Sequence, residues 1–303
     1  MPSAGAMLCL ASAAAFATSA IFGKLAYEQG ATVGTLLASR FVLAAALFWL
    51  FMGATGRVRR LRELSRRDVG IALALGIVGY SAQSGAFFAA LQRLDASLLS
   101  LLLYTFPTIV TVAAVVLGRE RATRRTALAL ALASTGLALV LAGARDGALD
   151  LVGVGLGLTA AVVYSAYILT SEGVASRLGA LTMSALVCTG AAVSLTFGGF
   201  ALGDLHPGDV SAAGFGWLGG LAVVSTVGAI ALFFAGLQRV GPTAASILST
   251  LEPVVTVVLA FQIFGESLGA VPLAGGALVI VAVLAVRAPM RLATEPAAAE
   301  ARA

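Results

Sequence analysis

Three charged side chains of this chain lie inside otherwise apolar stretches: Glu252, Arg40 and Lys24. In a lipid-like environment a charged group is costly unless it is paired, protonated or in contact with water. These residues are therefore the first candidates for chemistry. That chemistry would be proton transfer, or recognition of a solute that carries an opposite charge.

Glu252 falls near the middle of the apolar run 242–264. In a functional role, its carboxylate would bind a coupling proton or the amine of a substrate. In a structural role, it would pair with Arg40 or Lys24, or accept a hydrogen bond near a kink at Pro253. Both interpretations stay open at this point.

The two cations also have two interpretations each. Arg40 lies ~10 Å from the nearer membrane surface at 1.5 Å per residue, and its guanidinium could recognise a carboxylate or another anion. We favour a structural role for Arg40, in which it contacts Glu252 or exposed carbonyl groups. Lys24 lies one turn from the end of its run, and we expect it to extend outward to the interface rather than to pair with Glu28.

Polar and aromatic side chains recur at helical spacing on several apolar runs, so that each set lies on one helix face. The sets are Tyr80, Gln83, Ser84 and Phe87; Ser97, Ser100 and Tyr104; Tyr164 and Tyr167; Ser225 and Thr226; and Ser246, Ser249 and Thr250. Taken singly, each Ser or Thr is expected to bond its own helix or a neighbour. Together these faces would suit zwitterionic or weakly polar amphiphilic metabolites.

An internal repeat relates the two halves of the sequence. The segment Phe87–Arg93 recurs at Phe233–Arg239, and Pro107 recurs at Pro253, with one constant offset (233 − 87 = 146, 253 − 107 = 146). A proline inside a helix removes one backbone hydrogen bond and bends the helix. Pro107 and Pro253 are therefore either static kinks or a pair of hinges.

The composition indicates an all-α polytopic membrane protein. Of 303 residues, 60% are hydrophobic and 11% charged, whereas soluble domains carry about 25% charged residues. Ten apolar runs are each long enough to cross a bilayer. They are 5–27, 33–52, 70–91, 96–117, 124–142, 151–171, 180–202, 213–235, 242–264 and 268–287.

The distribution of arginines predicts that both termini are cytoplasmic in the inner (plasma) membrane. With that orientation, two arginines fall outside, Arg93 and Arg145. Fifteen fall inside: Arg57, Arg59, Arg60, Arg62, Arg66, Arg67, Arg119, Arg121, Arg124, Arg125, Arg177, Arg239, Arg287, Arg291 and Arg302. Because each half has five spans, the second half (147–289) must cross the membrane upside down relative to the first (1–146). A disordered cytoplasmic tail is expected at 290–303.

The repeated segments resemble the EamA family of the drug/metabolite transporter superfamily. The matching residues are Lys24, Ser39-Arg40-Phe41, Leu91 with Ala96–Leu99, Pro107, Gly118–Arg121 and Gly136 in the first half, and Leu237, Ala244-Ala245, Leu251–Val254 and Gly265–Leu268 in the second. This resemblance implies ten helices as two inverted five-helix repeats, with spans 1–4 and 6–9 around a central cavity and spans 5 and 10 peripheral. It also implies export of amino acids or other small metabolites, and of drugs in some members. The chain departs from exact symmetry, because Leu186 stands opposite Arg40 and Phe106 opposite Glu252.

We therefore expect a secondary-active transporter that works by alternating access, with export of amino acids or related amphiphilic compounds favoured. The alternatives are a multidrug or toxic-compound efflux carrier and a facilitative channel. An enzyme is not expected, since the spans contain no histidine and the sole histidine, His206, lies in a loop. No cofactor, metal or nucleic acid is expected. We interpret Cys9 and Cys188 as small core residues. The expected partners are a small-molecule substrate and the bilayer, and the chain is expected to be a monomer.

Overall fold

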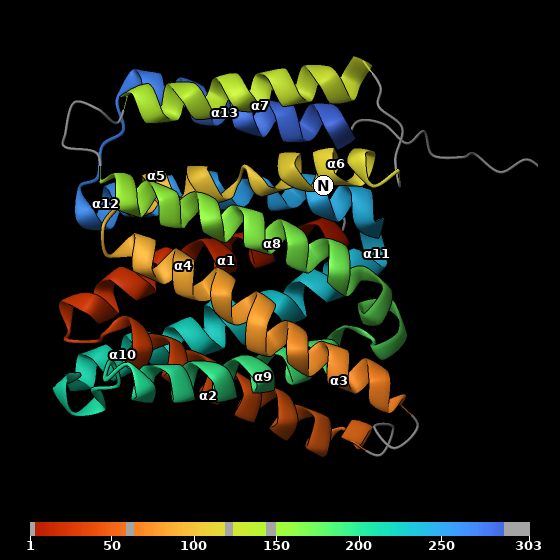
Figure 1. The fold of residues 1–303 in the computed structure, drawn as a ribbon, viewed down its shortest axis with the longest axis vertical. Coiled ribbons are helices and arrows are strands. Elements are labelled where there is room, and N and C mark those ends of the chain that lie inside the picture. Colours follow the sequence, from red (N-terminus) through yellow and green to blue (C-terminus); the bar gives the residue numbers. More distant parts are fainter. Residues whose placement is uncertain (1–3, 59–63, 119–123, 144–149, 288–303) are drawn as a thin grey trace, which may run out of the picture.

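The structure, a computed structural model, describes residues 4–58, 64–118, 124–143 and 150–287 (Figure 1). Within these residues all regular structure is helical. The helices are α1 (Ala4–Glu28), α2 (Val33–Ala54), α3 (Arg66–Ala74), α4 (Ser81–Leu91), α5 (Ala96–Leu103), α6 (Phe106–Val116), α7 (Arg124–Gly143), α8 (Leu151–Leu178), α9 (Ala180–Ala201), α10 (Ala212–Ala222), α11 (Ala229–Ser249), α12 (Leu251–Phe264) and α13 (Ala270–Arg287). The π-helical segments η2 (Leu75–Tyr80) and η5 (Val223–Gly228) join α3 to α4 and α10 to α11.

Seven helical stretches of the described chain are long and apolar enough to cross a membrane. They correspond to the first four and to the sixth, seventh and eighth of the ten expected spans. The other three expected spans contain shorter apolar helices, Leu130–Ala142, Leu251–Phe264 and Ala270–Ala282. The chain is thus a multi-pass membrane protein.

Short polar side chains and glycines set the helix ends. Thr32, Asp150 and Ser211 each accept a hydrogen bond from a backbone N–H of the first turn of α2, α8 and α10, which would otherwise have no partner. At the other ends, Gly179 follows α8 with φ 74° and Gly265 follows α12 with φ 67°. These angles favour glycine because it lacks a Cβ, so both helices stop where glycine occurs.

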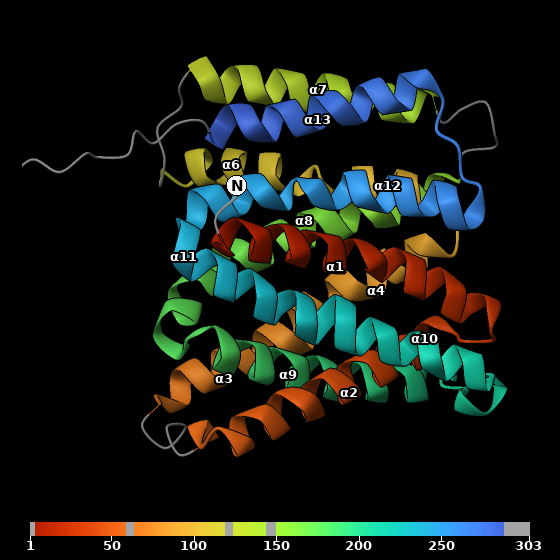
Figure 2. The same cartoon turned by 180° about the vertical axis from the view of Figure 1, so that it is seen from behind.

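The helices lie roughly side by side, and α7 and α13 form a separate pair at one edge of the bundle (Figures 1 and 2). These two helices approach closely because glycines face each other. A methyl group on Gly136 of α7 would lie 2.6 Å from the carbonyl oxygen of Gly275 on α13. Small residues at a contact allow helix backbones to approach in this way.

The first helices of the two sequence halves run in opposite directions. In Figure 1, α1 runs from right to left and α8 from left to right, and α1 begins at the end of the bundle where α13 finishes. The turn between α4 and α5, which contains Arg93, lies at the left end of the bundle. The chain reverses direction at the opposite end within α11, which contains Arg239.

Spans four and nine are interrupted rather than bent. The turn Tyr104–Thr105 separates α5 from α6, and Thr250 separates α11 from α12. The two breaks obey the repeat (250 − 104 = 146). Pro107 and Pro253 lie in the first turns of the helices that follow, where a missing backbone N–H costs little. Both prolines therefore begin a helix, unlike the mid-helix bends that the sequence suggested.

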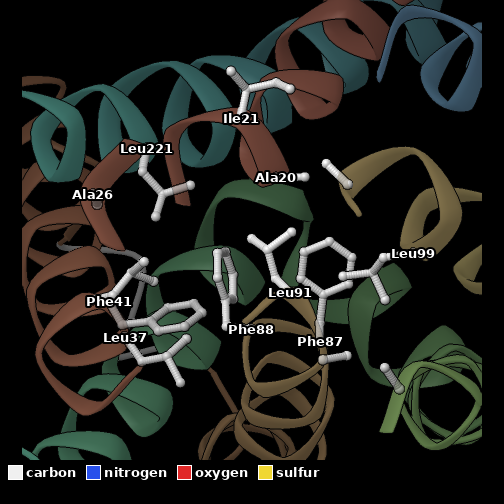
Figure 3. Packing of buried hydrophobic residues seen from close by; sticks show 14 of the residues in the cluster. Ala20, Ile21, Ala26, Leu37, Phe41, Phe87, Phe88, Leu91, Leu99 and Leu221 are labelled. Atoms are coloured by element: carbon white, nitrogen blue, oxygen red, sulfur yellow. The ribbon is translucent and has the colours of Figure 1, made fainter. Parts of the chain in front are cut away.

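The structure also differs from the expected loop between spans eight and nine, at residues 236–241. Helix α11 continues through these residues to Ser249, so the first part of span nine belongs to the same helical element as the end of span eight. The hydrophobic core is formed by buried side chains of α1, α2, α4, α5 and α10, which pack against one another (Figure 3). Phe41, Phe88, Leu91 and Leu221 are almost completely buried there. The expected tail 290–303 lies outside the described residues.

Candidate functional site: a cavity between the two halves

A cavity of about 700 Å³ lies between the two halves of the chain. Helices from both halves contribute to its wall, namely α1, α2, α4, α5, α6, α8, α9, α11 and α12. The candidate residues from the sequence that line it are Tyr80, Gln83, Ser84, Phe87, Ser100, Tyr104, Tyr164, Tyr167, Ser249, Glu252, Arg40 and Pro253. Lys24 and Pro107 do not line it, and the side chain of Ser246 lies outside the described residues.

Arg40 is held in place on one side of the cavity. Arg40 as a whole residue is 5% exposed, and its Nε donates a 2.9 Å hydrogen bond to Oγ1 of Thr226 on η5. The rings of Phe41 and Phe88 lie 5.0 and 5.3 Å from the guanidinium carbon. Among the described residues Arg40 forms no ion pair, so the expected contact with Glu252 is not present in this conformation.

Glu252 lies in the first turn of α12, just after the break at Thr250. Unpaired N–H groups at a helix N-terminus favour a carboxylate there. The hydroxyl of Tyr104, from the equivalent break in the first half, donates to Glu252 Oε2 at 3.3 Å and also to the backbone oxygen of Ser249. Neither Arg40 nor Lys24 pairs with Glu252. Of the structural alternatives, the structure shows a hydrogen bond near Pro253.

Aromatic rings form a continuous strip along the cavity. Tyr80 and Tyr167 lie 5.5 Å apart by ring centroids, Tyr167 and Tyr164 6.3 Å, Tyr164 and Phe106 4.7 Å, and Phe106 and Tyr104 5.7 Å. Phe106, the repeat counterpart of Glu252, joins the tyrosines from the two halves. The strip presents a rigid apolar face with hydroxyl groups at its edges.

Several hydroxyls satisfy their own helices, as expected for single Ser and Thr residues. Ser100 Oγ donates to the oxygen of Ser97 at 2.8 Å, and Thr226 Oγ1 donates to that of Leu221 at 3.0 Å. Ser97 instead donates from Oγ to Glu266 at 2.9 Å. These bonds position helix backbones, and they leave the cavity wall mostly apolar.

Lys24 pairs with acids from other elements and not with Glu28 on its own helix. Its Nζ lies 2.5 Å from Glu266 Oε1 and 3.6 Å from Asp95 Oδ1. Glu266 also accepts hydrogen bonds from the backbone N–H groups of Ala96 and Ser97, and therefore caps α5 rather than the helix that follows it in sequence. Lys24 thus pairs with acids from other elements rather than with Glu28. Glu120, the repeat counterpart of Glu266, lies outside the described residues.

Among the described residues, the lining of the cavity extends toward one end of the bundle. Its lining extends to Ala175 and Ala180 beside the α8–α9 connection, and no residue of the α1–α2, α4–α5 or α12–α13 connections contributes among those described. The α4–α5 and α12–α13 connections lie at the opposite end of the bundle. There the carboxylate of Glu266 links them by accepting hydrogen bonds from Ala96 and Ser97. The side chains of Phe88 and Leu91 fill the space beside Gly23 of α1, where a methyl group would lie 2.6 Å from Phe88.

Some lining residues were not singled out from the sequence. They are small, apolar or aromatic residues such as Phe16, Ala20, Phe106, Cys188, Phe233 and Phe234. The repeated Phe-Phe pairs were a usable signal, since Phe87 had been chosen and Phe233 is its counterpart. Cys9 and Cys188 are both buried and free, in agreement with the expected role as small core residues, although Cys188 also touches the cavity.

Comparisons with known proteins agree with this architecture. The model of the EamA-like transporter family matches the chain twice, at residues 3–142 and 151–288. An uncharacterized transporter of Bacillus subtilis (strain 168), YcbK, is 26% identical over 286 residues, covering 90% of this chain and 89% of the relative. An uncharacterized transporter of Archaeoglobus fulgidus is 29% identical over 230 residues, covering 74% and 78%. The crystal structure of another protein shares the fold, with a TM-score of 0.65 and 18% identity, covering 94% of this chain and 97% of that one.

The two family matches, which together span most of this helical membrane bundle, identify the chain as a membrane transport protein. The chain belongs to the EamA-like transporter family. Membership implies a small-molecule substrate and contact with membrane lipid, and it indicates a transporter rather than an enzyme.

Proposed function

We propose that this protein is a secondary-active transporter that moves amino acids or related amphiphilic metabolites out of the cell by alternating access. The observation that carries the proposal is the cavity itself, since both halves line it and, among the described residues, its lining extends toward one end of the bundle. A site between two repeats that opens to one side at a time is the arrangement used by such carriers.

The proposal includes ten spans arranged as two inverted repeats. The opposite directions of α1 and α8 and the two family matches support this arrangement. In it both termini are cytoplasmic in the plasma membrane, so the cavity opens to the cytoplasm in this conformation. The proposed carrier is a monomer, since helices of one chain line the cavity from both halves, and the proposal includes no cofactor.

Glu252 is assigned a role in proton coupling or in binding the amine of a substrate. It is the only acidic residue among the described residues that line the cavity, and its hydrogen-bond partner Tyr104 comes from the other half. A carboxylate at this position can exchange a proton or an ammonium group with whichever side the cavity faces. The hinge role of Pro107 and Pro253 belongs to the same proposal, since each follows the break in its half.

Flux measurements test the proposal. Full-length protein in proteoliposomes is expected to move amino acids with a saturable rate and to show counterflow. If Glu252 couples protons, Glu252→Gln should abolish uptake driven by a pH gradient while exchange continues, because exchange needs no net proton movement. If Glu252 binds the substrate amine, exchange should be slowed as well. The matched control Asp209→Asn, at an exposed loop acid, should leave both unchanged. A conductance that does not saturate would indicate a channel, and unchanged pH dependence in Glu252→Gln would remove Glu252 from coupling.

A multidrug or toxic-compound efflux carrier is the second candidate. The aromatic strip from Tyr80 to Tyr104 favours it, because stacked rings bind planar apolar cations and ligands of varied shape. The same flux assay with lipophilic cations as substrates separates the two functions.

A further inference from the structure

We infer that Arg40 is the residue that selects the substrate, by binding its carboxylate, so that the transported compound is a zwitterion or a monocarboxylate rather than a simple amine. This inference rests on the proposed transport function and assigns a chemical class to its substrate. It also gives Arg40 a different role from the structural one that its sequence position suggested.

The first step of the argument is that the guanidinium is fixed in orientation. Thr226 accepts from Nε at 2.9 Å, and Thr226 is itself held by its bond to the oxygen of Leu221. Phe41 and Phe88 contact the guanidinium as well. A long side chain that is held on its Nε edge and by two rings leaves its two terminal Nη groups in one defined place.

The second step is that these Nη groups reach the cavity. In the described part of the chain, Arg40 has the single hydrogen bond to Thr226, and no carboxylate pairs with it. Because Arg40 lines the cavity and its Nη groups bond to no other described residue, these groups are available to a ligand in the cavity.

The third step concerns charge. A buried guanidinium without a counter-ion is costly. An anionic group of a ligand in the cavity can serve as that counter-ion. Two parallel N–H donors match the two oxygens of a carboxylate. Arg40 is the only cation among the described lining residues, so it can balance one negative charge, whereas a doubly charged phosphate would remain half neutralised.

Glu252 supplies a negative charge that can bind the ammonium group of the same substrate. It lines the same cavity as Arg40, so a solute with both an ammonium and a carboxylate group can contact one residue with each. Neither charge has a counterpart in the other half, where Leu186 and Phe106 stand at the equivalent positions. The duplicated scaffold therefore does not require these charges, and a ligand that is itself asymmetric accounts for both.

The test compares acids with their amides. Proteoliposomes are loaded with an equimolar mixture of the twenty L-amino acids and the corresponding twenty carboxamides, and efflux of each is followed by mass spectrometry. Wild-type protein should release acids at least about tenfold faster than the matching amides. Arg40→Gln should slow the acids about 10- to 100-fold, as expected for a lost hydrogen bond to a charged group, and leave the amides unchanged.

Two further variants separate recognition from stability. Thr226→Val removes the acceptor for Nε but keeps the charge, so KM for the acids should rise several-fold while kcat and the amide rates stay unchanged. This variant carries the test if Arg40→Gln does not fold. Arg93→Gln, which removes an exposed arginine, should keep the wild-type ratio of acid to amide.

The inference is overturned if wild-type protein releases acids and amides at equal rates. It is also overturned if Arg40→Gln slows both classes equally, or if adding Glu252→Gln to Arg40→Gln restores the acids, which would indicate an internal ion pair. Absence of saturable flux for every compound would contradict the proposed transport function, and with it this inference.

Discussion

At the scale of single residues, Glu266 joins three elements, because its carboxylate accepts hydrogen bonds from Lys24 of α1 and from Ala96 and Ser97 of α5. Burial alone would raise the pKa of its carboxyl, but Lys24 and the N–H groups of Ser97 and Ala96 outweigh burial and lower that pKa. The folded protein therefore binds this proton more weakly than the unfolded chain does. The resulting stabilisation is complete above the unfolded pKa of about 4.3 and is lost as the pH falls through the lowered folded value.

Glu266→Gln is therefore expected to lose about 2 kcal/mol of stability at neutral pH, the range for hydrogen bonds to a charged group. The measurement is thermal unfolding in detergent between pH 3 and pH 8. The gap to wild type should narrow as the pH falls below about 4, where the wild-type carboxylate takes up its proton.

Glu28→Gln is the matched control, because Glu28 is the exposed acid on the helix of Lys24. It should change stability by less than about 0.5 kcal/mol. A loss in Glu28→Gln equal to that in Glu266→Gln, or a gap that does not depend on pH, would contradict the assignment of Glu266 as the partner of Lys24.

The sequence identified the charged residues but not their partners. Lys24 and Glu266 are 242 positions apart, and Arg40 and Thr226 are 186 apart. Helical spacing predicts which residues share a face, and it predicted many of the polar and tyrosine residues of the cavity wall. Contacts between helices depend on how the helices pack, and one sequence contains no direct record of that packing.

At the scale of elements, the two halves are interrupted at related places. The π-helical segments η2 and η5 occupy spans three and eight (228 − 80 = 148, two positions from the repeat offset), and the breaks after Leu103 and Ser249 occupy spans four and nine. At each π segment a hydroxyl donates to the carbonyl five residues earlier. Ser81, directly after η2, donates to Gly76 at 2.8 Å, and Thr226, within η5, donates to Leu221 at 3.0 Å. Such π segments often occur at functional sites, and here Tyr80 lies in η2 and Arg40 contacts Thr226 of η5.

Gly76→Ala should destabilise the protein, because a methyl group at Gly76 would lie 3.0 Å from the Cα of Val187 on α9 and still closer to its carbonyl oxygen. Overpacking of this kind costs about 1–3 kcal/mol. Gly85→Ala, in the same span, has no neighbouring atom within 4 Å and should be neutral or stabilising by up to ~1 kcal/mol. Thermal unfolding of both variants checks this, and equal effects would contradict the close contact between η2 and α9.

Most helix positions could be predicted from apolar runs, and those of α1, α2 and α9 agree with the structure to within two residues. The π segments could not, because their residues are as apolar as the rest of each span. The continuous helix through 236–241 was missed because Gly241 and Pro242 suggested a loop. Glycine and proline report local backbone preference, and a proline inside a helix can bend the helix without ending it.

At the scale of the whole molecule, the sequence contained the duplication in a direct form. The offset of 146 and the bias of arginines predicted two halves of opposite orientation, and the opposite directions of α1 and α8 are in keeping with that prediction. The cavity could be anticipated as a wall of polar and aromatic faces. The sequence alone could not predict toward which end of the bundle the cavity extends, because this depends on contacts between helices such as that of Glu266 with α5.

The measurement that tests the inverted arrangement most directly is the sidedness of positions 93 and 239. Arg93 and Arg239 are repeat-related and exposed, and a surface ion pair such as that of Arg93 with Asp150 is worth at most about 1 kcal/mol. Arg93→Cys and Arg239→Cys can therefore be made singly and labelled in intact cells with a membrane-impermeant maleimide. Cysteine 93 should react from outside, and cysteine 239 only after permeabilisation. Labelling of both positions from the same side would contradict the account.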